Sequence, residues 1–314
     1  MLGKTANSIF WMYRYLERAE NTARLLEAGF RMALTRGVDI ANEEWRSVIV
    51  TLGLGEAYDA CHDEYSGEDV CNFVLRGKGN PLSVFSMIEN ARSNARMSRT
   101  SITAEVWESV NECWMALKEV TARPLRESSL GTALQTIRRE ATLVRGATYG
   151  SMLRNDIYHF ARAGTFLERA DNTARILDVK YYLLLPSLAY VGSSLDTGQW
   201  ETVLRSLSAE RAYRWLNAGR MDPRGIADFL ILDRRFPRSL TFCYTELEQH
   251  LASLARDYGE DGHCHALLRE AGARLSASTI DSIFDQGLHE FLVAFTLGNQ
   301  AIANAISDEY RFVA

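Results

Sequence analysis

The sequence Leu16-Glu-Arg-Ala-Glu-Asn-Thr-Ala-Arg-Leu-Leu26 occurs a second time as Leu167-Glu-Arg-Ala-Asp-Asn-Thr-Ala-Arg-Ile-Leu177. Nine of the eleven positions are identical, and the two copies are 151 residues apart. Both copies mix apolar, charged and polar residues, so the match is not a product of low-complexity sequence. Self-similarity at a long, fixed offset indicates a duplicated structural unit. We therefore expect two tandem units, residues 1–150 and 151–314.

Weaker matches follow the motif in the same order in both halves of the chain. The matching positions are Trp45/Trp200, Val48/Val203 and Leu52/Leu207 at an offset of 155, and Phe73/Phe229, Pro81/Pro237 and Ser83/Ser239 at an offset of 156. The offset drifts by only five residues, as a few loop insertions would produce. The sequence thus predicts two repeats related by a pseudo-two-fold axis and packed as one body.

The spacing of apolar residues predicts an all-α fold. Around the first motif they recur at steps of three and four, which places Leu16, Ala19, Ala23, Leu26 and Phe30 on one stripe of a helix. This helix is expected to begin near Asn7 or Ser8 and to end before Gly37, and its counterpart to run over residues 155–185 and end at Pro186. Further helices are expected at residues 42–52, 81–99, 102–121, 130–146, 199–207, 209–218, 239–258, 265–275 and 280–310. The six tryptophans, Trp215 among them, fall at helical positions and are expected in the core.

Composition narrows the classes of function. The 314 residues carry a net charge of −5 and no basic cluster, which argues against nucleic acid as the main partner. The five cysteines form no CxxC pair, so a reducing cytoplasm is the expected environment. The N-terminus has no apolar signal region, and the most apolar run, residues 181–191, is too short to span a bilayer.

The duplicated motif places charged side chains on shared helix faces. Residues three or four apart are neighbours on a helix, so the first copy aligns Arg14, Glu17, Asn21 and Arg24 on one face with Arg18 and Thr22 beside it. Such a face can bind an anionic or zwitterionic ligand, with arginine forks holding the anion and glutamate exchanging a proton. The residues expected to do so are Glu17 and Glu168 as acid/base groups, and Arg18, Asn21, Arg24, Arg169, Asn172 and Arg175 as ligand-binding groups.

An architectural role for the same residues is the alternative. Duplicated helices often pack against each other, and the glutamates of one copy would then pair with the arginines of the other. Partly buried ion pairs of that kind specify geometry more than they stabilise the fold.

Other motifs give weaker signals. His263-x-His265 beside Cys264 resembles a metal-binding spacing, but it lies in a glycine-flanked turn without a second ligand pair. The only Glu-x-x-His, from Glu260 to His263, crosses Gly262, so a ferritin-like di-metal bundle is not expected. Nucleotide-binding and hydrolase motifs are absent from the sequence. We therefore expect neither a metal nor a cofactor.

The stretch Phe10-Trp-Met-Tyr-Arg-Tyr-Leu-Glu-Arg-Ala-Glu-Asn-Thr-Ala-Arg-Leu-Leu26 resembles the opening of the alpha-E family, which is all-helical and has a Glu-Arg motif. The resemblance covers essentially the whole chain. By resemblance, Glu17, Arg18, Glu168 and Arg169 carry the family motif. The second copy has Arg162 and Gly164 where the first has Trp11 and Tyr13, so equal function in the two copies is not implied.

The resemblance implies a bacterial cytoplasmic protein encoded beside, or fused to, a circularly permuted ATP-grasp protein, often with a transglutaminase-like protein. We therefore expect a non-catalytic or accessory protein that acts with the ATP-grasp ligase on an amide or peptide-like product. The alternative is an enzyme or small-ligand binder that uses the duplicated Glu/Arg/Asn face for an anionic, amino-acid-like substrate. A third interpretation is a homo-oligomeric scaffold.

Overall fold

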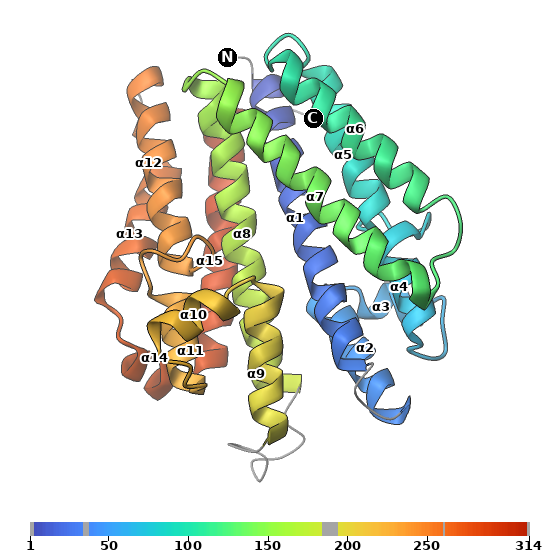
Figure 1. Cartoon of the computed structure of the whole chain (residues 1–314). Coiled ribbons are helices and arrows are strands. Elements are labelled where there is room, and N and C mark those ends of the chain that lie inside the picture. Colours follow the sequence, from blue (N-terminus) through green and yellow to red (C-terminus); the bar gives the residue numbers. More distant parts are fainter. Residues whose placement is uncertain (1–2, 34–37, 184–193, 260, 313–314) are drawn as a thin grey trace. The chain divides into compact units, whose positions relative to one another are not determined.

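A computed structural model of the chain describes residues 3–33, 38–183, 194–259 and 261–312 (Figure 1). These residues form helices α1–α15 and the turns between them, and they contain no β-strand. The chain divides into two compact units, which we call the N-terminal unit (residues 11–153) and the C-terminal unit (residues 1–10 and 154–314). The expectation of an all-helical fold is confirmed.

The last helix of the N-terminal unit packs along the helix that precedes it and also contacts the first helix. The helices of this unit are α1 (Gly3–Ala33, from residue 11 onward), α2 (Val38–Thr51), α3 (Gly55–Asp59), α4 (Gly67–Arg76), α5 (Val84–Met97), α6 (Ala104–Val120) and α7 (Glu127–Ser151). Contacts between Tyr13 and Thr148 and between Glu27 and Arg138 show that α1 and α7 run antiparallel. Helix α6 packs against α7, and α5 packs against α6 (Figure 1).

The C-terminal unit is built on three long helices. Its helices are residues 3–10 of α1, then α8 (Asp156–Leu183), α9 (Ser194–Ser206), α10 (Glu210–Leu216), α11 (Pro223–Ile231), α12 (Leu240–Tyr258), α13 (His263–Ala277), α14 (Ile280–Gln286) and α15 (Leu288–Glu309). Helix α8 packs antiparallel to α12, as the contacts of His159 with His250 and of Phe166 with Phe242 show. It packs antiparallel to α15, as the contacts of Asp178 with His289 and of the Leu167 carbonyl with Asn299 show. Helix α13 packs on α12 and α15.

The predicted apolar stripe of the motif helix is buried. Leu16, Ala19, Ala23 and Leu26 are at most 3% exposed, and Phe30 is half-buried at the end of the stripe. In the second copy, Leu167, Ala170, Ala174 and Leu177 are fully buried. Alanine at these positions allows neighbouring helices to approach closely, and each buried leucine contributes about 1.5–3 kcal/mol through removal of apolar surface from water.

Several helix boundaries differ from the expectation. Helices α3, α4 and α11 lie in regions where no helix was expected, and α1 begins four or five residues early, at Gly3. The expected helix at residues 280–310 is divided into α14 and α15 by Gly287, whose φ of +103° is accessible to glycine but not to other residues without strain. The expected end of the second motif helix at Pro186 lies outside the described residues.

Of the six tryptophans expected in the core, two are buried, one is exposed, and the other three, Trp11, Trp107 and Trp114, are only half-buried. Trp45 and Trp200, which occupy matching positions in the two copies, are buried, whereas Trp215 on α10 is 85% exposed. Helical spacing alone could not separate these cases, because α10 has only seven residues and covers little of its own surface.

Among the described residues, no helix is long and apolar enough to cross a bilayer.

Candidate functional site

The acidic residues of the first motif are buried in the N-terminal unit. The side chains of Glu17 and Glu20 are 1% and 0% exposed, and both face Arg145 of α7. Arg145 pairs closely with Glu20, and its Nη1 lies 3.6 Å from Glu17 Oε2. Arg24, one turn along α1, donates to Glu20 Oε1 from Nε at 3.0 Å and from Nη2 at 2.6 Å. We call these four residues the α1–α7 charge cluster.

The balance of opposite charges in the cluster lowers the free-energy cost of burying it. Two carboxylates and two guanidiniums balance in formal charge, and an isolated buried carboxylate would lose several kcal/mol of hydration. Arginine is suited to this place because its fork can donate to two carboxylates at once. The cluster therefore joins α1 to α7, and the Glu20 carboxylate binds one arginine from each of these helices.

The sequence placed Arg24 on the face of Glu17, but the structure pairs it with Glu20. The signal was available, because Glu20 precedes Arg24 by four residues in the favourable acid-before-base order. The second copy repeats this spacing, and Asp171 Oδ2 accepts from Arg175 Nε at 2.7 Å. Arg145 could not be found in this way, because it lies 125 residues from Glu20 and reaches it only through the pairing of α1 with α7.

The remaining predicted residues of the first copy lie around this cluster. Asn21 and Thr22 are buried, Arg18 is half-buried, and Arg14 is buried with its guanidinium 4.5 Å from the centre of the Trp11 ring. Stacking of arginine on an aromatic face offsets part of the cost of its burial.

The second motif supports a turn of the C-terminal unit. Glu168 and Arg169 are 3% and 8% exposed, and Asn172 is half-buried. Arg169 Nη1 donates to the Pro237 carbonyl at 3.2 Å, and Thr173 Oγ1 donates to the Arg238 carbonyl at 2.8 Å. These bonds satisfy carbonyls of the turn that precedes α12, where backbone groups have no helical partner.

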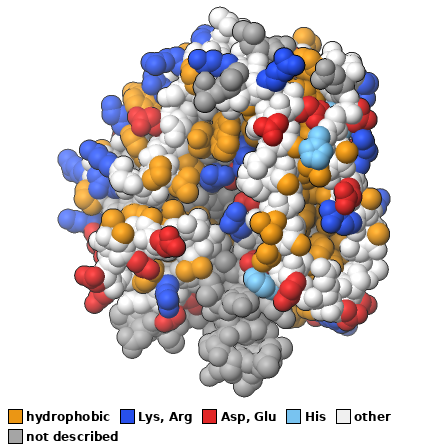
Figure 2. Space-filling view, turned by 180° about the vertical axis from the view of Figure 1, so that it is seen from behind, with side chains coloured by type: hydrophobic (Ala, Val, Ile, Leu, Met, Phe, Trp, Pro, Cys, Tyr) orange, Lys and Arg blue, Asp and Glu red, His pale blue; other side chains and the backbone are white. Residues whose placement is uncertain are grey.

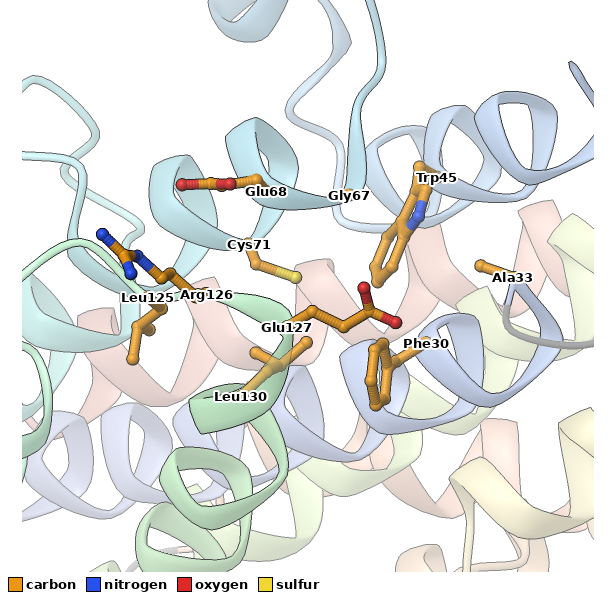
Figure 3. A pocket seen from close by; sticks show the side chains of 10 residues that line it. All are labelled: Phe30, Ala33, Trp45, Gly67, Glu68, Cys71, Leu125, Arg126, Glu127 and Leu130. Carbon is orange, nitrogen blue, oxygen red and sulfur yellow. The ribbon is translucent and has the colours of Figure 1, made fainter. Parts of the chain in front are cut away.

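A separate pocket of about 260 Å³ lies between α1, α2, α4 and the start of α7 (Figure 3). Its apolar wall includes Phe30, Trp45 and Leu130, and the Glu127 carboxylate lies near the two aromatic rings. Gly67 allows the close packing here, because a Cβ at this position would lie 2.7 Å from Trp45 Nε1.

The thiol in this pocket is not activated. Burial raises the pKa of Cys71 to about 12, so at neutral pH the thiol is protonated and a poor nucleophile. The pocket contains none of the residues predicted from the motif.

The His263-x-His265 pair was expected in a turn, but it lies in the first turn of α13. His263 is exposed, whereas His265 is 4% exposed and faces the protein interior. The two rings therefore do not share a ligand-binding position, although His265 has other neighbours that are described below.

The surface carries charges of both signs. On the face drawn in Figure 2, blue basic and red acidic side chains of the described residues are interspersed with apolar ones. Trp215 of α10 is the largest exposed apolar side chain among the described residues, and Leu216 beside it is 40% exposed.

A profile of the Alpha-E family, described as a predicted alpha-helical domain with a conserved ER motif, matches residues 1–310. No curated protein and no solved structure shows significant similarity to the chain. The match covers nearly all of the sequence, including both copies of the Glu-Arg motif. The chain belongs to the Alpha-E family.

Proposed function

We propose that the chain is a bacterial, cytoplasmic accessory protein without catalytic activity of its own. It acts with a circularly permuted ATP-grasp ligase, and with a transglutaminase-like protein, in making or processing an amide or peptide-like product. The observation that supports a non-catalytic role is the α1–α7 charge cluster. A general acid or base must reach its substrate, whereas the Glu17 and Glu20 carboxylates are buried against arginines of their own unit.

We further propose that residues 1–150 and 151–314 are two copies of one repeat related by a pseudo-two-fold axis. Matching local features support this duplication. Helices α5 and α12 both begin after a Pro-x-Ser sequence, and in both the serine Oγ accepts from the backbone N–H three residues later. Trp45 and Trp200, at matching positions, are both buried.

The proposed partner surface includes Trp215. A fully solvated indole costs free energy, and tryptophan is enriched among residues that dominate protein–protein binding. Ion pairs hold the base of this side chain: Arg214 pairs with Glu201 at 2.7 Å and with Glu210 at 3.2 Å, and Arg205 pairs with Glu210 at 2.9 Å. The short helix α10 is thereby fixed to α9 and presents Trp215 in a defined position.

Co-purification of the chain with the ATP-grasp protein of the same genome tests the proposal. We expect a stable complex, and we expect Trp215→Ala to weaken its affinity by about 30-fold, which corresponds to a binding residue worth about 2 kcal/mol. Leu297→Ala is the matched control, because Leu297 is also apolar and 68% exposed in the C-terminal unit. If both proteins are folded and do not associate, the accessory role is wrong. If they associate and the two variants bind equally well, the partner surface lies elsewhere.

A further inference from the structure

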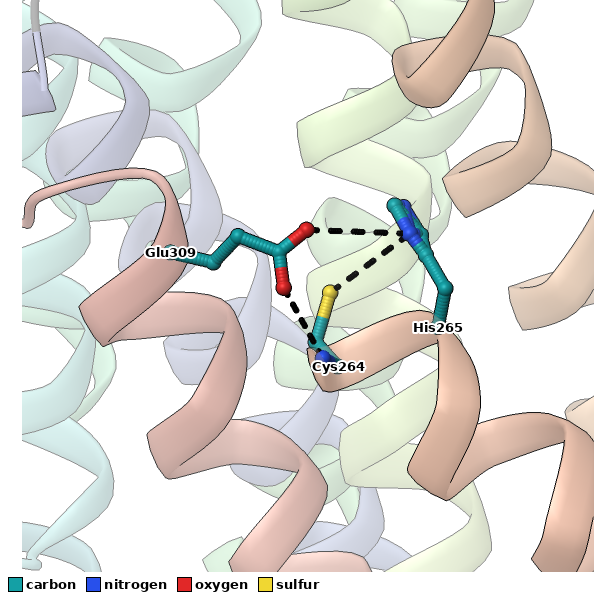
Figure 4. Close-up of side chains that lie close together, drawn as sticks. All are labelled: Cys264, His265 and Glu309. Atoms are coloured by element: carbon teal, nitrogen blue, oxygen red, sulfur yellow. Dashed lines mark hydrogen bonds and ion pairs between the residues drawn. The ribbon is translucent and has the colours of Figure 1, made fainter. Parts of the chain in front are cut away.

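Three metal-ligating side chains come together where α13 begins and α15 ends (Figure 4). Cys264 and His265 belong to the first turn of α13, and Glu309 is the last residue of α15. One ligating atom from each lies within 4.8 Å of the others, and all three residues belong to the C-terminal unit. Cys264 and His265 are buried, and the Glu309 side chain is 12% exposed.

The distances from the His265 nitrogen to the other two ligating atoms approach those between ligands of one metal ion. His265 Nδ1 lies 3.9 Å from Cys264 Sγ and 3.7 Å from Glu309 Oε1. The nitrogen-to-oxygen distance is too long for a hydrogen bond. Tetrahedral zinc, with bonds of about 2.0–2.3 Å, separates its ligand atoms by roughly 3.3–3.6 Å. Both distances from His265 Nδ1 are a few tenths of an ångström longer than this separation.

The backbone holds Glu309 in place for this role. Its Oε2 accepts from the Cys264 backbone N–H at 2.9 Å, which caps α13 where the N-cap residue Gly262 has no side chain to do so. A Cβ at Gly262 would lie 2.6–2.7 Å from the carboxylate atoms, so glycine is needed for this approach. The other oxygen, Oε1, is buried and has no hydrogen-bond partner among the described residues. That oxygen is available to a cation.

The histidine ring is oriented from its far side. Tyr310 Oη lies 3.2 Å from His265 Nε2, and Tyr310 directly follows Glu309 in the chain. With Nε2 protonated and donating to the tyrosine oxygen, Nδ1 presents its lone pair to the ion. Metal-binding histidines are commonly fixed by a second hydrogen bond of this kind.

A pocket beside His265 would let the ion exchange with solvent. This pocket has a volume of about 300 Å³, lies beside α12 and α13 and is lined by His265, Asp261 and Arg269. Asp261 Oδ1 is 3.8 Å from His265 Nδ1, but Arg269 binds the same carboxylate at 2.8 and 3.0 Å. We therefore expect a water molecule from this pocket to be the fourth ligand of the ion.

We propose that Cys264, His265 and Glu309 form a binding site for one zinc-class divalent cation that joins the start of α13 to the end of α15. A thiolate, a neutral imidazole and a carboxylate together neutralise a 2+ ion, and nitrogen and sulfur donors favour zinc over magnesium or calcium. On binding, the Cys264 thiol loses its proton to solvent as the Zn–S bond forms.

The test is titration of the chelator-treated full chain with Zn²⁺, and with Co²⁺ as a spectroscopic probe. The measurements use a Cys61→Ser background, because Cys61 is exposed and can bind metal adventitiously. We expect one equivalent of Zn²⁺ per chain, a thiolate-to-cobalt charge-transfer band, and a rise in Tm on adding Zn²⁺.

Cys264→Ser and Glu309→Gln should each abolish the one-to-one binding and the rise in Tm, and Tyr310→Phe should weaken affinity by about tenfold. His263→Ala is the matched control, because this adjacent histidine is exposed, and it should bind as the parent does. The proposal is overturned if the parent binds no zinc. It is also overturned if Co²⁺ binds to the parent without a thiolate-to-cobalt band, or if the folded Glu309→Gln variant binds zinc as tightly as the parent.

Discussion

Glu20 and Asp171 occupy the same place in the two copies of the motif, but their surroundings differ. The Glu20 side chain is fully buried and meets both Arg24 and Arg145, whereas Asp171 is 14% exposed and meets Arg175, which is 49% exposed. The acid–arginine pair at four-residue spacing was visible in the sequence. Its burial was not, because burial depends on a helix more than a hundred residues away.

Loss of the acid should therefore cost more in the first copy than in the second. We expect Glu20→Ala to lower the free energy of unfolding by about 3 kcal/mol, because Arg24 loses the carboxylate that it binds and Arg145 keeps only the more distant Glu17. The matched variant Asp171→Ala removes a surface pair and should cost about 1 kcal/mol or less. Denaturant unfolding followed by circular dichroism measures both, and equal losses would contradict the assigned environments.

At the scale of helices, the starts of α5 and α12 show what the sequence could and could not predict. These helices were expected to begin at residues 81 and 239, whereas they begin at Val84 and Leu240. Ser83 and Ser239 are the N-caps, with fully buried side chains. The Pro-x-Ser spacing contained this information, since serine is a far stronger N-cap signal than a nearby proline.

Both caps should contribute to stability by similar amounts. We expect Ser83→Ala and Ser239→Ala each to lower the free energy of unfolding by about 1 kcal/mol, because each leaves a backbone N–H of the first turn without its acceptor. Ser128→Ala, at an exposed position in the first turn of α7, is the control and should be neutral. If a cap variant matches the control in chemical denaturation, the cap assignment fails.

The pairing of α8 with α12 encloses two histidines. His159 Nδ1 lies 3.0 Å from His250 Nδ1, and His250 stacks on Phe166. Burial, Arg162 and His159 lower the pKa of His250 from 6.5 to about 3, and burial lowers the pKa of His159. The unfolded chain therefore binds more protons than the folded chain below about pH 6.5.

Stability should consequently fall as the pH drops from about 6.5 toward 3. His250 contributes a slope of up to about 1.4 kcal/mol per pH unit in this window. We expect His250→Phe, which keeps an aromatic ring against Phe166, to flatten the dependence measured by denaturant unfolding between pH 7 and pH 4.5. The exposed His263→Ala control should retain the parental slope. Parallel curves for the parent and His250→Phe would show that His250 is not buried in its neutral form.

On the scale of the whole molecule, the all-helical class and most long helices could be predicted from apolar spacing, as α1, α6, α8 and α12 show. The short helices α3, α4 and α11 could not, because five to ten residues give too little periodicity to separate a helix from a loop. The break at Gly287 was missed because an isolated glycine within an apolar pattern is tolerated in many helices. Of the site, the motif residues were found, but their partners Arg145 and the carbonyl groups of Pro237 and Arg238 required the tertiary fold.

The most direct test of the non-catalytic role is product formation by the ATP-grasp protein in the presence of this chain. The chain would carry Glu17→Gln and Glu168→Gln together, which remove the only acid/base groups assigned to the duplicated motif while keeping the shape of the side chains. Circular dichroism and Tm establish that the variant is folded. We predict that it supports the same rate of product formation as the parent chain. A folded variant that still binds the ATP-grasp protein but gives no product would show that the motif glutamates take part in the chemistry.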